Sequence, residues 1–314
     1  MTIKRLGVVM DPISSIHRKK DSTFAMLLEA KARGYEIYYF EQKDLFLQEG
    51  KAFGDAQLLD VHDEDTTWFT FKGAKRIALH ECQIILMRKD PPFNEEYIYT
   101  TYILEHAERL GARVVNRPQA LRDANEKMFT TFFAECMPKT LVSSTYQHLH
   151  DFWQQYGDIV CKPLNGMGGV SVFRLQKNDV NAKVVFETLT QQGQCYIMAQ
   201  QFIPDITQGD KRILMLNGEP VPHVLARIPQ GNDWRGNLAM GAKGVVQPIS
   251  ENDLKICKIV GPTLRKMGLY FVGLDVIGNY LTEINVTSPT CIREIDRDAK
   301  INISAQLFNI LENI

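Results

Sequence analysis

Two apolar runs with a helical segment between them make up the start of the chain. Residues 6–10 and 35–40 are almost unbroken apolar runs of strand length, which is typical of buried strands. Between them, Asp21 or Ser22 can cap a helix that runs to Arg33. A strand, a helix and a strand at this spacing predict a right-handed βαβ unit and a parallel sheet.

The same alternation of elements continues to a first boundary near residue 122. Buried strands are expected at 84–87 and 113–116, with a long helix over 95–110 between them. The segment 48–75 alternates only weakly, and it is expected to form an irregular hairpin. Residues 1–122 are therefore predicted to form an α/β domain built on a parallel sheet.

Residues 123–200 and 201–314 are expected to form two further units of mixed helices and strands. Asp123 or Asn125 can cap a helix that carries Lys127 in its first turn. Further strands are expected at 140–142, 158–163, 170–174, 195–204, 210–216 and 221–228, and further helices at 147–155, 181–191, 250–267 and the C-terminus.

A hairpin near the end of the chain carries the first chemical signal. Two apolar runs flank Gly278 and Asn279, a pair typical of a tight turn. Asp275 lies in the first strand, and Glu283 and Asn285 lie two residues apart in the second, so those two share a face. Such an all-oxygen group suits Mg²⁺ held between protein and phosphates. A solvent-facing strand with ordinary polar alternation is the alternative, and the lysines and glycines upstream favour the metal.

Composition restricts the classes of partner. The chain has 314 residues, 45% of them hydrophobic, with Lys+Arg 36 against Asp+Glu 37 and a net charge of -1. That balance gives no general attraction to nucleic acid or to a membrane surface, so any anion site must be local. No apolar run reaches the length of a membrane span, and no secretory signal opens the chain. Reduced thiols and a cytoplasmic location are expected, because no Cys-x-x-Cys pair is found among Cys82, Cys136, Cys161, Cys195, Cys257 and Cys291.

A glycine-rich loop follows the strand that ends on Lys162. Gly166, Gly168 and Gly169 separate two predicted strands and can present backbone N–H groups to phosphate oxygens. The loop is neither a Walker loop nor a dinucleotide fingerprint, because no Gly-Lys-Ser/Thr follows and the glycines lead to a strand. A plain β-turn is the alternative, and Lys162 three residues before the loop favours phosphate.

A second glycine-rich segment, 229–244, has few apolar residues and includes Arg235 and Lys243. A loop of this length within a compact enzyme is typical of a lid or of disorder, and a mobile lid is expected here.

Arg88 and Lys89 follow a predicted strand, where they could face an anion or form part of a solvated loop. Cys291 could act as a nucleophile, although a packed bystander thiol is the favoured interpretation.

The order of these parts resembles the ATP-grasp superfamily, and longer strings resemble the bacterial glutathione synthetases over essentially the whole chain. The strings are MDP at 10–12, MRKDPPF at 87–93, NGMGG at 165–169, RIPQG at 227–231, RGNLA at 235–239 and TEINVTSPTCIRE at 282–294. The resemblance implies an α/β ATP-grasp fold. It has an N-terminal parallel-sheet domain (1–122), a central lid domain (123–200) and a C-terminal antiparallel-sheet domain (201–314).

The resemblance also implies roles for individual residues. ATP is expected to contact Lys127, Lys162, Gly166, Gly168, Gly169, Gln200, Gln201, Phe202, Ile203, Asp210, Asp275 and Asn285. Mg²⁺, or Mn²⁺, is expected on Asp275, Glu283 and Asn285. The catalytic cations that face the peptide carboxylates and the transferring phosphoryl group are expected to be Arg212, Arg227 and Arg235. For the thiol peptide itself, Asp21, Ser22 and Arg88 are candidate contacts.

The implied reaction joins γ-glutamylcysteine to glycine through an acyl phosphate, in a homotetramer. Such chemistry needs positioning and charge neutralisation rather than a covalent nucleophile, and arginines bind carboxylate and phosphate in a bidentate manner. Two alternatives remain: a related carboxylate–amine ligase for another peptide, and a non-ligase such as a nucleotide-binding regulator or an ATP-grasp kinase.

Overall fold

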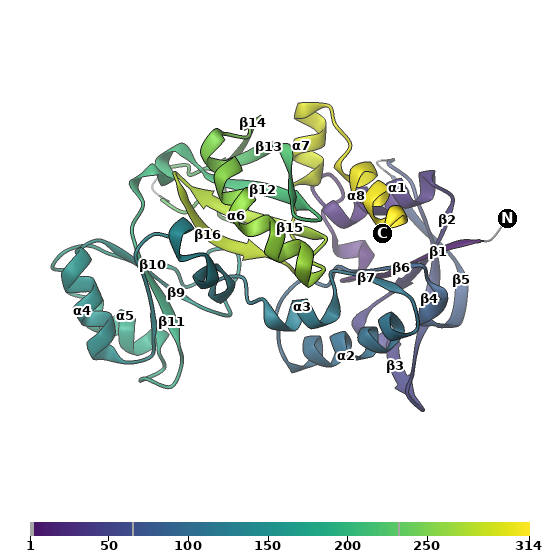
Figure 1. Cartoon of the computed structure of the whole chain (residues 1–314), viewed down its shortest axis with the longest axis horizontal. Helices are drawn as coiled ribbons and strands as arrows, with labels where there is room; N and C mark the ends of the chain where they lie inside the picture. The colour runs from purple at the N-terminus through teal and green to yellow at the C-terminus, as the bar shows by residue number, and fades with distance from the viewer. Residues whose placement is uncertain (1–2, 65, 232) are drawn as a thin grey trace.

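Three β-sheets organise the chain (Figure 1). The structure is a computed structural model that describes residues 3–64, 66–231 and 233–314. The first sheet contains the parallel strands β1 (Lys4–Val9), β2 (Tyr35–Phe40), β6 (Ile84–Met87) and β7 (Arg113–Val115), in the order β2-β1-β6-β7. Helix α1 (Ser22–Ala32) connects β1 to β2, and α2 (Glu95–Arg109) connects β6 to β7. The predicted parallel βαβ arrangement is confirmed.

An antiparallel extension makes this first sheet mixed rather than purely parallel. Strands β3 (Leu45–Gln48), β4 (Lys51–Val61) and β5 (Phe69–Ala78) occupy the segment expected to form an irregular hairpin. Strand β4 pairs antiparallel with β2, where Ile37 lies opposite Leu59, and β5 pairs along most of β4. The expected irregular hairpin is confirmed as β4 and β5, whose register shifts between Leu58 and Leu59. The alternation is weak because the buried positions in the first half of β4 are the small residues Ala52, Gly54 and Ala56.

The second sheet is antiparallel and has a hydrophobic core of its own. Its strands are β8 (Thr140–Ser143), β9 (Ile159–Pro163), β10 (Phe173–Leu175) and β11 (Ile197–Gln201), in the order β10-β9-β11-β8. Helices α4 (Tyr146–Tyr156) and α5 (Ala182–Leu189) pack on it through Leu149, Trp153 and Phe186. Figure 1 shows this unit at the left end of the molecule, on the far side of the third sheet from β1 and β2.

The third sheet is also antiparallel and contains the predicted C-terminal hairpin. Its strands are β12 (Asp210–Leu216), β13 (Glu219–Ile228), β14 (Lys243–Pro248), β15 (Phe271–Ile277) and β16 (Tyr280–Asn285), in the order β14-β13-β12-β15-β16. Helix α6 (Glu251–Met267), capped by Ser250, packs against it. The core of this sheet is continuous with that of the first, since Val9 and Met87 belong to the same buried cluster as Leu274 and Ile284.

Two helix predictions were wrong, and one loop is shorter than expected. In place of a helix carrying Lys127, α3 (Pro118–Asp123) ends early and a 3-10 segment, η4 (Met128–Cys136), begins after that lysine. The Asn125 side chain does accept hydrogen bonds from Lys127 N and Met128 N, at 3.1 and 2.9 Å, so the capping part of the prediction is correct.

The C-terminal segment forms two helices rather than one, α7 (Ile292–Ala299) and α8 (Ile303–Asn313), because Lys300 between them adopts a left-handed conformation. The 229–244 segment ends in β14, which begins at Lys243.

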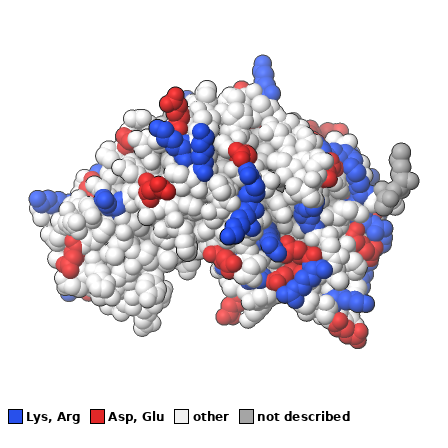
Figure 2. Space-filling model, viewed as in Figure 1, with Lys and Arg blue, Asp and Glu red and all other residues white. Residues whose placement is uncertain are grey.

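The described surface adds little to the search for a site. Figure 2 shows cationic and anionic side chains interspersed over one face, as the net charge of -1 suggests. None of the helices among the described residues is long and apolar enough to cross a membrane. All six cysteines are free thiols, and all but Cys195 are buried.

One buried amide connects the first sheet to the third. Asn116, which follows β7, donates through Nδ2 to Phe271 O and Val286 O at 2.7 Å each, and its Oδ1 accepts from Phe271 N at 2.8 Å. The side chain is only 3% exposed, so water cannot easily replace these bonds. Asn116 therefore fixes the C-terminal hairpin against the N-terminal sheet.

Replacing Asn116 with Ala is expected to lower the free energy of unfolding by about 3 kcal/mol, since each buried polar group left unpaired costs about 1–3 kcal/mol. Denaturant unfolding of both proteins measures the change. Asn313→Ala, which removes an exposed amide near the C-terminus, is the matched control and should change stability by less than about 0.5 kcal/mol. An equal effect of the two substitutions would contradict the bridging role.

Candidate active site

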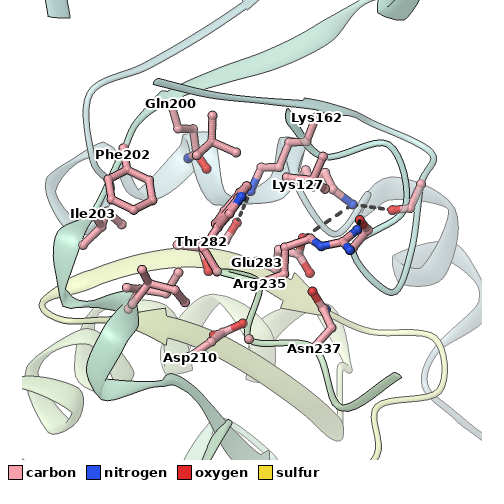
Figure 3. Close-up of a pocket in the computed structure, with 18 of the residues that line it drawn as sticks. Lys127, Lys162, Gln200, Phe202, Ile203, Asp210, Arg235, Asn237, Thr282 and Glu283 are labelled. Atoms are coloured by element: carbon pink, nitrogen blue, oxygen red, sulfur yellow. Dashed lines mark hydrogen bonds and ion pairs between the residues drawn. The ribbon is translucent and has the colours of Figure 1, made fainter. Parts of the chain in front are cut away.

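A cavity of about 820 Å³ lies between the second and third sheets (Figure 3). Strands β9 and β11 contribute to one side, β12 and β16 to the other, and two loops complete it. It brings together most of the residues predicted to bind ATP: Lys127, Lys162, Gly166, Gly168, Gly169, Gln200, Gln201, Phe202, Ile203 and Asp210. Residues from positions 127 to 210 in the sequence thus share one cavity.

Two buried lysines face this cavity, and one of them has no carboxylate partner. Lys162 is 6% exposed, donates to Thr282 O at 3.3 Å and forms no ion pair with any residue that the structure describes. Burial lowers its pKa. Lys127, 2% exposed, donates to Gly166 O at 2.6 Å and pairs with Glu126 and, at 3.6 Å, with Glu283. A buried ammonium without a counter-charge is costly, so an anionic ligand is the natural partner of Lys162.

The glycine loop turns tightly at the wall of the cavity. Gly168 and Gly169 have φ values of 64° and 81°, in the left-handed region that favours glycine. A Cβ at Gly169 would lie 2.5 Å from Asn237 Oδ1, so a second loop packs directly on the glycines. Arg235 from that loop donates to Gly169 O at 2.9 Å. The loop does contain a β-turn, since Val170 N donates to Met167 O at 3.2 Å, and this turn lines the cavity beside two buried lysines.

The segment after β11 places an aromatic ring and a backbone N–H at the wall of the cavity. The Phe202 ring lies under the Arg174 guanidinium at 3.5 Å and meets the Trp234 ring edge-on at 5.9 Å. The backbone N–H groups of Gln201 and Phe202 already donate, to Lys139 O and Asp158 O. Among the described residues the N–H of Ile203 has no acceptor, which leaves it available to a ligand.

A buried network of two carboxylates and two guanidiniums underlies the cavity. Arg212 donates to Asp275 through Nε and Nη2 at 2.5 and 3.0 Å, and Arg227 Nη2 lies 2.9 Å from Asp275 and 2.6 Å from Asp210. Burial alone would raise the pKa of Asp275, but the two guanidiniums hold it well below its usual range. Burial raises the pKa of Asp210 to about 6 despite Arg227. The Oδ1 atom of Asp210 is buried without a partner among the described residues, in a side chain that lines the first cavity.

A second cavity, of about 810 Å³, adjoins the first and contains the predicted metal ligands. It is lined by Asp275, Glu283 and Asn285 together with Arg212 and Arg227. Asn285 Nδ2 donates to Gly273 O at 3.3 Å, which leaves its Oδ1 free to bind a cation. Glu283 and Asn285 thus offer oxygens of the kind that a hard divalent ion prefers, whereas both oxygens of Asp275 are held by Arg212 and Arg227.

Only three of the described lining residues border both cavities: Gly168, Asn237 and Glu283. The boundary is the place where a group could pass from a ligand in one cavity to a ligand in the other. Glu283 reaches it through a β-bulge, because Asp275 pairs with Glu283 whereas Val276 pairs with Leu281. The extra residue, Thr282, presents its carbonyl oxygen to Lys162.

The structure uses the candidate thiol-peptide residues differently from the prediction. Asp21 caps α1, Ser22 Oγ accepts from Ile292 N at 3.1 Å, and Arg88 donates to Thr23 Oγ1 at 3.0 Å and to Pro289 O at 2.8 Å. None of the three lines either cavity. Sequence reasoning also missed Trp234, Asn237 and Thr282; the polar Asn237 in a glycine-rich loop was the available signal.

Comparison with known proteins agrees with this geometry. The model of the prokaryotic glutathione synthetase N-terminal domain matches residues 5–122, and that of the prokaryotic glutathione synthetase ATP-grasp domain matches residues 126–300. The chain belongs to the prokaryotic glutathione synthetase family. It is 55% identical to the glutathione synthetase of Vibrio parahaemolyticus, covering 98% of both chains, and 53% identical to that of Escherichia coli K12, again covering 98% of both.

More distant solved structures share the fold. The ATP-grasp ligase PsnB complexed with a minimal precursor has a TM-score of 0.65 at 17% identity and covers 99% of both chains. The D-cycloserine synthetase DcsG has a TM-score of 0.67 at 15% identity, covering 98% of this chain and 99% of that one. The predicted ATP-grasp fold is confirmed, and the glutathione synthetase family places an ATP-dependent ligase on it.

Replacing Lys162 with Ala is expected to weaken ATP binding about 10- to 100-fold, because a hydrogen bond to a charged group contributes about 1.5–3 kcal/mol. Affinity for the thiol peptide should change much less, since Lys162 lines only the nucleotide cavity. Calorimetric titration of each ligand measures both effects. Lys177→Ala removes an exposed lysine of the same unit and serves as the control. Loss of peptide affinity with ATP affinity unchanged would reverse the assignment of the two cavities.

Proposed function

We propose that the chain joins γ-glutamylcysteine to glycine, with conversion of ATP to ADP and phosphate through an acyl phosphate. The observation that supports this most directly is the pair of adjoining cavities. One has buried lysines and a glycine loop, the other has buried arginines, and they meet at Gly168, Asn237 and Glu283. Family membership supplies the substrates, since the curated relatives at 53–55% identity are glutathione synthetases.

In this proposal the first cavity orients ATP. The base lies against Phe202 with Ile203 N–H as a donor, and Asp210 Oδ1 accepts from the nucleotide. Lys127 and Lys162 neutralise the phosphates, and the glycine loop closes on them. This orientation directs the terminal phosphoryl group to the boundary.

The second cavity holds the carboxylates of the peptide. Arg212 and Arg227 line it, and both are partly neutralised by Asp275, so they orient an incoming carboxylate without trapping it as a permanent ion pair. The peptide carboxylate attacks the terminal phosphorus of ATP, a P–O bond forms, and the bond to the ADP oxygen breaks. The amine of glycine then attacks the acyl carbon and phosphate leaves, after the amine has lost a proton to solvent.

Mg²⁺, or Mn²⁺, is proposed to bind Glu283 and Asn285 with Asp275 beside them, where its charge would offset that of the transferring phosphoryl group. Glu283 would set the position of the metal ion, because among the described residues it is the one carboxylate that borders both cavities. Its 3.6 Å contact with Lys127 connects the metal position to the phosphate position.

Glu283→Gln should lower kcat by about 10²-fold or more, since a single electrostatic contact made in the transition state is typically worth that much. It should also raise the Mg²⁺ concentration needed for half-maximal rate. Steady-state rates over a Mg²⁺ titration measure both effects. Glu219→Gln, an exposed carboxylate of the same sheet, is the control. Near-normal activity at limiting Mg²⁺ would remove Glu283 from the metal site.

We also propose that the segment between β13 and β14 is a lid. It packs on the glycine loop through Arg235, and Trp234 packs on Phe202, so it covers the nucleotide cavity. An acyl phosphate hydrolyses if water reaches it, which gives closure a function.

Trypsin should cut the free enzyme after Arg235, and ATP, Mg²⁺ and γ-glutamylcysteine together should slow that cut far more than cleavage after the exposed Lys177. Ligands that occupy the cavity hold the lid against the glycine loop, so the bond after Arg235 becomes inaccessible. Mass spectrometry of timed digests identifies both cuts. If trypsin cuts the ligand-free enzyme after Arg235 no faster than it cuts within the folded core, the segment is static and is not a lid.

A further inference from the structure

We infer that Asn237 is a further catalytic residue, whose side-chain amide donates a hydrogen bond to the phosphoryl group as it passes from ATP to the peptide carboxylate. The inference rests on the proposed function. It begins from position: Asn237 borders both cavities, and the other residues that do so are Gly168 and Glu283. Figure 3 shows the Asn237 side chain directed from its loop into the pocket, toward Glu283.

The local fold does not use this amide. Asn237 precedes the 3-10 turn η6 (Leu238–Met240), but its side chain makes no capping hydrogen bond there. The turn is held by the backbone instead, since Asn237 O accepts from Met240 N at 2.9 Å and from Ala242 N at 3.4 Å. The side chain also has no hydrogen bond to any other described residue. A polar group oriented into a cavity and unused by the turn is available to a ligand.

A neutral donor suits the chemistry at this point. In the transfer the bond between the terminal phosphorus and the ADP oxygen breaks while the bond to the peptide carboxylate oxygen forms, and negative charge is spread over the equatorial phosphoryl oxygens. Glu283 is anionic and Gly168 offers only backbone, so the amide of Asn237 is the side chain at the boundary that can donate. It stabilises that charge without giving up a proton.

The glycine loop fixes the position of Asn237. A Cβ on Gly169 would lie 2.5 Å from Asn237 Oδ1 and 3.1 Å from its Cγ, so the amide lies where any larger residue at Gly169 would displace it. Gly169 is therefore a positioning residue for Asn237. Closure of the lid then delivers the amide to the boundary at the same time as Arg235 reaches Gly169 O.

Exchange of isotopic label between the bridging and non-bridging oxygens of ATP, measured with γ-glutamylcysteine and Mg²⁺ but without glycine, reports the first transfer alone. Asn237→Ala should slow this exchange about 10²-fold, as loss of one donor to a transition-state oxyanion does, with ATP affinity nearly unchanged. Asn237→Asp should be slower still, because a carboxylate there repels the phosphoryl oxygens. Gln230→Ala, an exposed amide of the same loop that lines neither cavity, is the control and should exchange at the normal rate.

A double-mutant cycle with Gly169→Ala tests the positioning. Gly169→Ala alone should slow exchange, and it should cost less in the Asn237→Ala background, because the clash with Asn237 is then gone and only the strain of an Ala at a φ of 81° remains. Normal exchange in Asn237→Ala, or full additivity of the two substitutions, would overturn the inference. Absence of exchange in the unsubstituted enzyme would instead overturn the proposed function, so the two failures are distinguishable.

Discussion

The buried carboxylate of Asp275, held between Arg212 and Arg227, is the interaction on which the site depends. Both guanidiniums are buried and positive, and without this carboxylate they would repel each other across the centre of the third sheet. The three residues come from the adjacent strands β15, β12 and β13, so the sheet register itself sets their spacing. Removing the carboxylate would therefore leave Arg212 without a counter-charge among the described residues, and Arg227 with Asp210 alone, at the wall of the second cavity.

The division of the hydrophobic core explains why the nucleotide lies where it does. The first and third sheets share one buried cluster and are further connected by Asn116, whereas the second sheet has its own core around Leu149, Trp153 and Phe186. ATP is proposed to bind between these two bodies, where Lys162 on the second sheet faces Thr282 on the third. An anionic ligand there supplies the counter-charge that Lys162 lacks. It also contacts both of these separately packed units, which favours their closure around the ligand on binding.

The sequence was most informative where local signals and tertiary packing agree. The C-terminal hairpin, the parallel strands and the caps at Asp21, Asn125 and Ser250 follow from turn chemistry, apolar runs and short polar side chains, and the structure has all of them. The hairpin of β4 and β5 was expected, but its pairing with β2 was not, because small buried residues in β4 give little alternation. Most of the residues expected to contact ATP line one cavity, whereas Asp275 and Asn285 line the other. Asn237 and Trp234 could not be assigned, since only packing on Gly169 and Phe202 gives them a position.

The segment that carried much of the family resemblance, residues 288–294, serves packing between domains as much as chemistry. Arg88, at the carboxyl end of β6, donates to Pro289 O, and Ser22 at the start of α1 accepts from Ile292 N. Between them Cys291 is 1% exposed, and burial raises the pKa of its thiol, which disfavours the thiolate that a nucleophile requires. Asp90 and Pro91 of the N-terminal domain line the second cavity together with residues 287–291. Arg88 and Ser22 thus hold the backbone of this segment at the wall of the second cavity, which Arg212 and Arg227 also line.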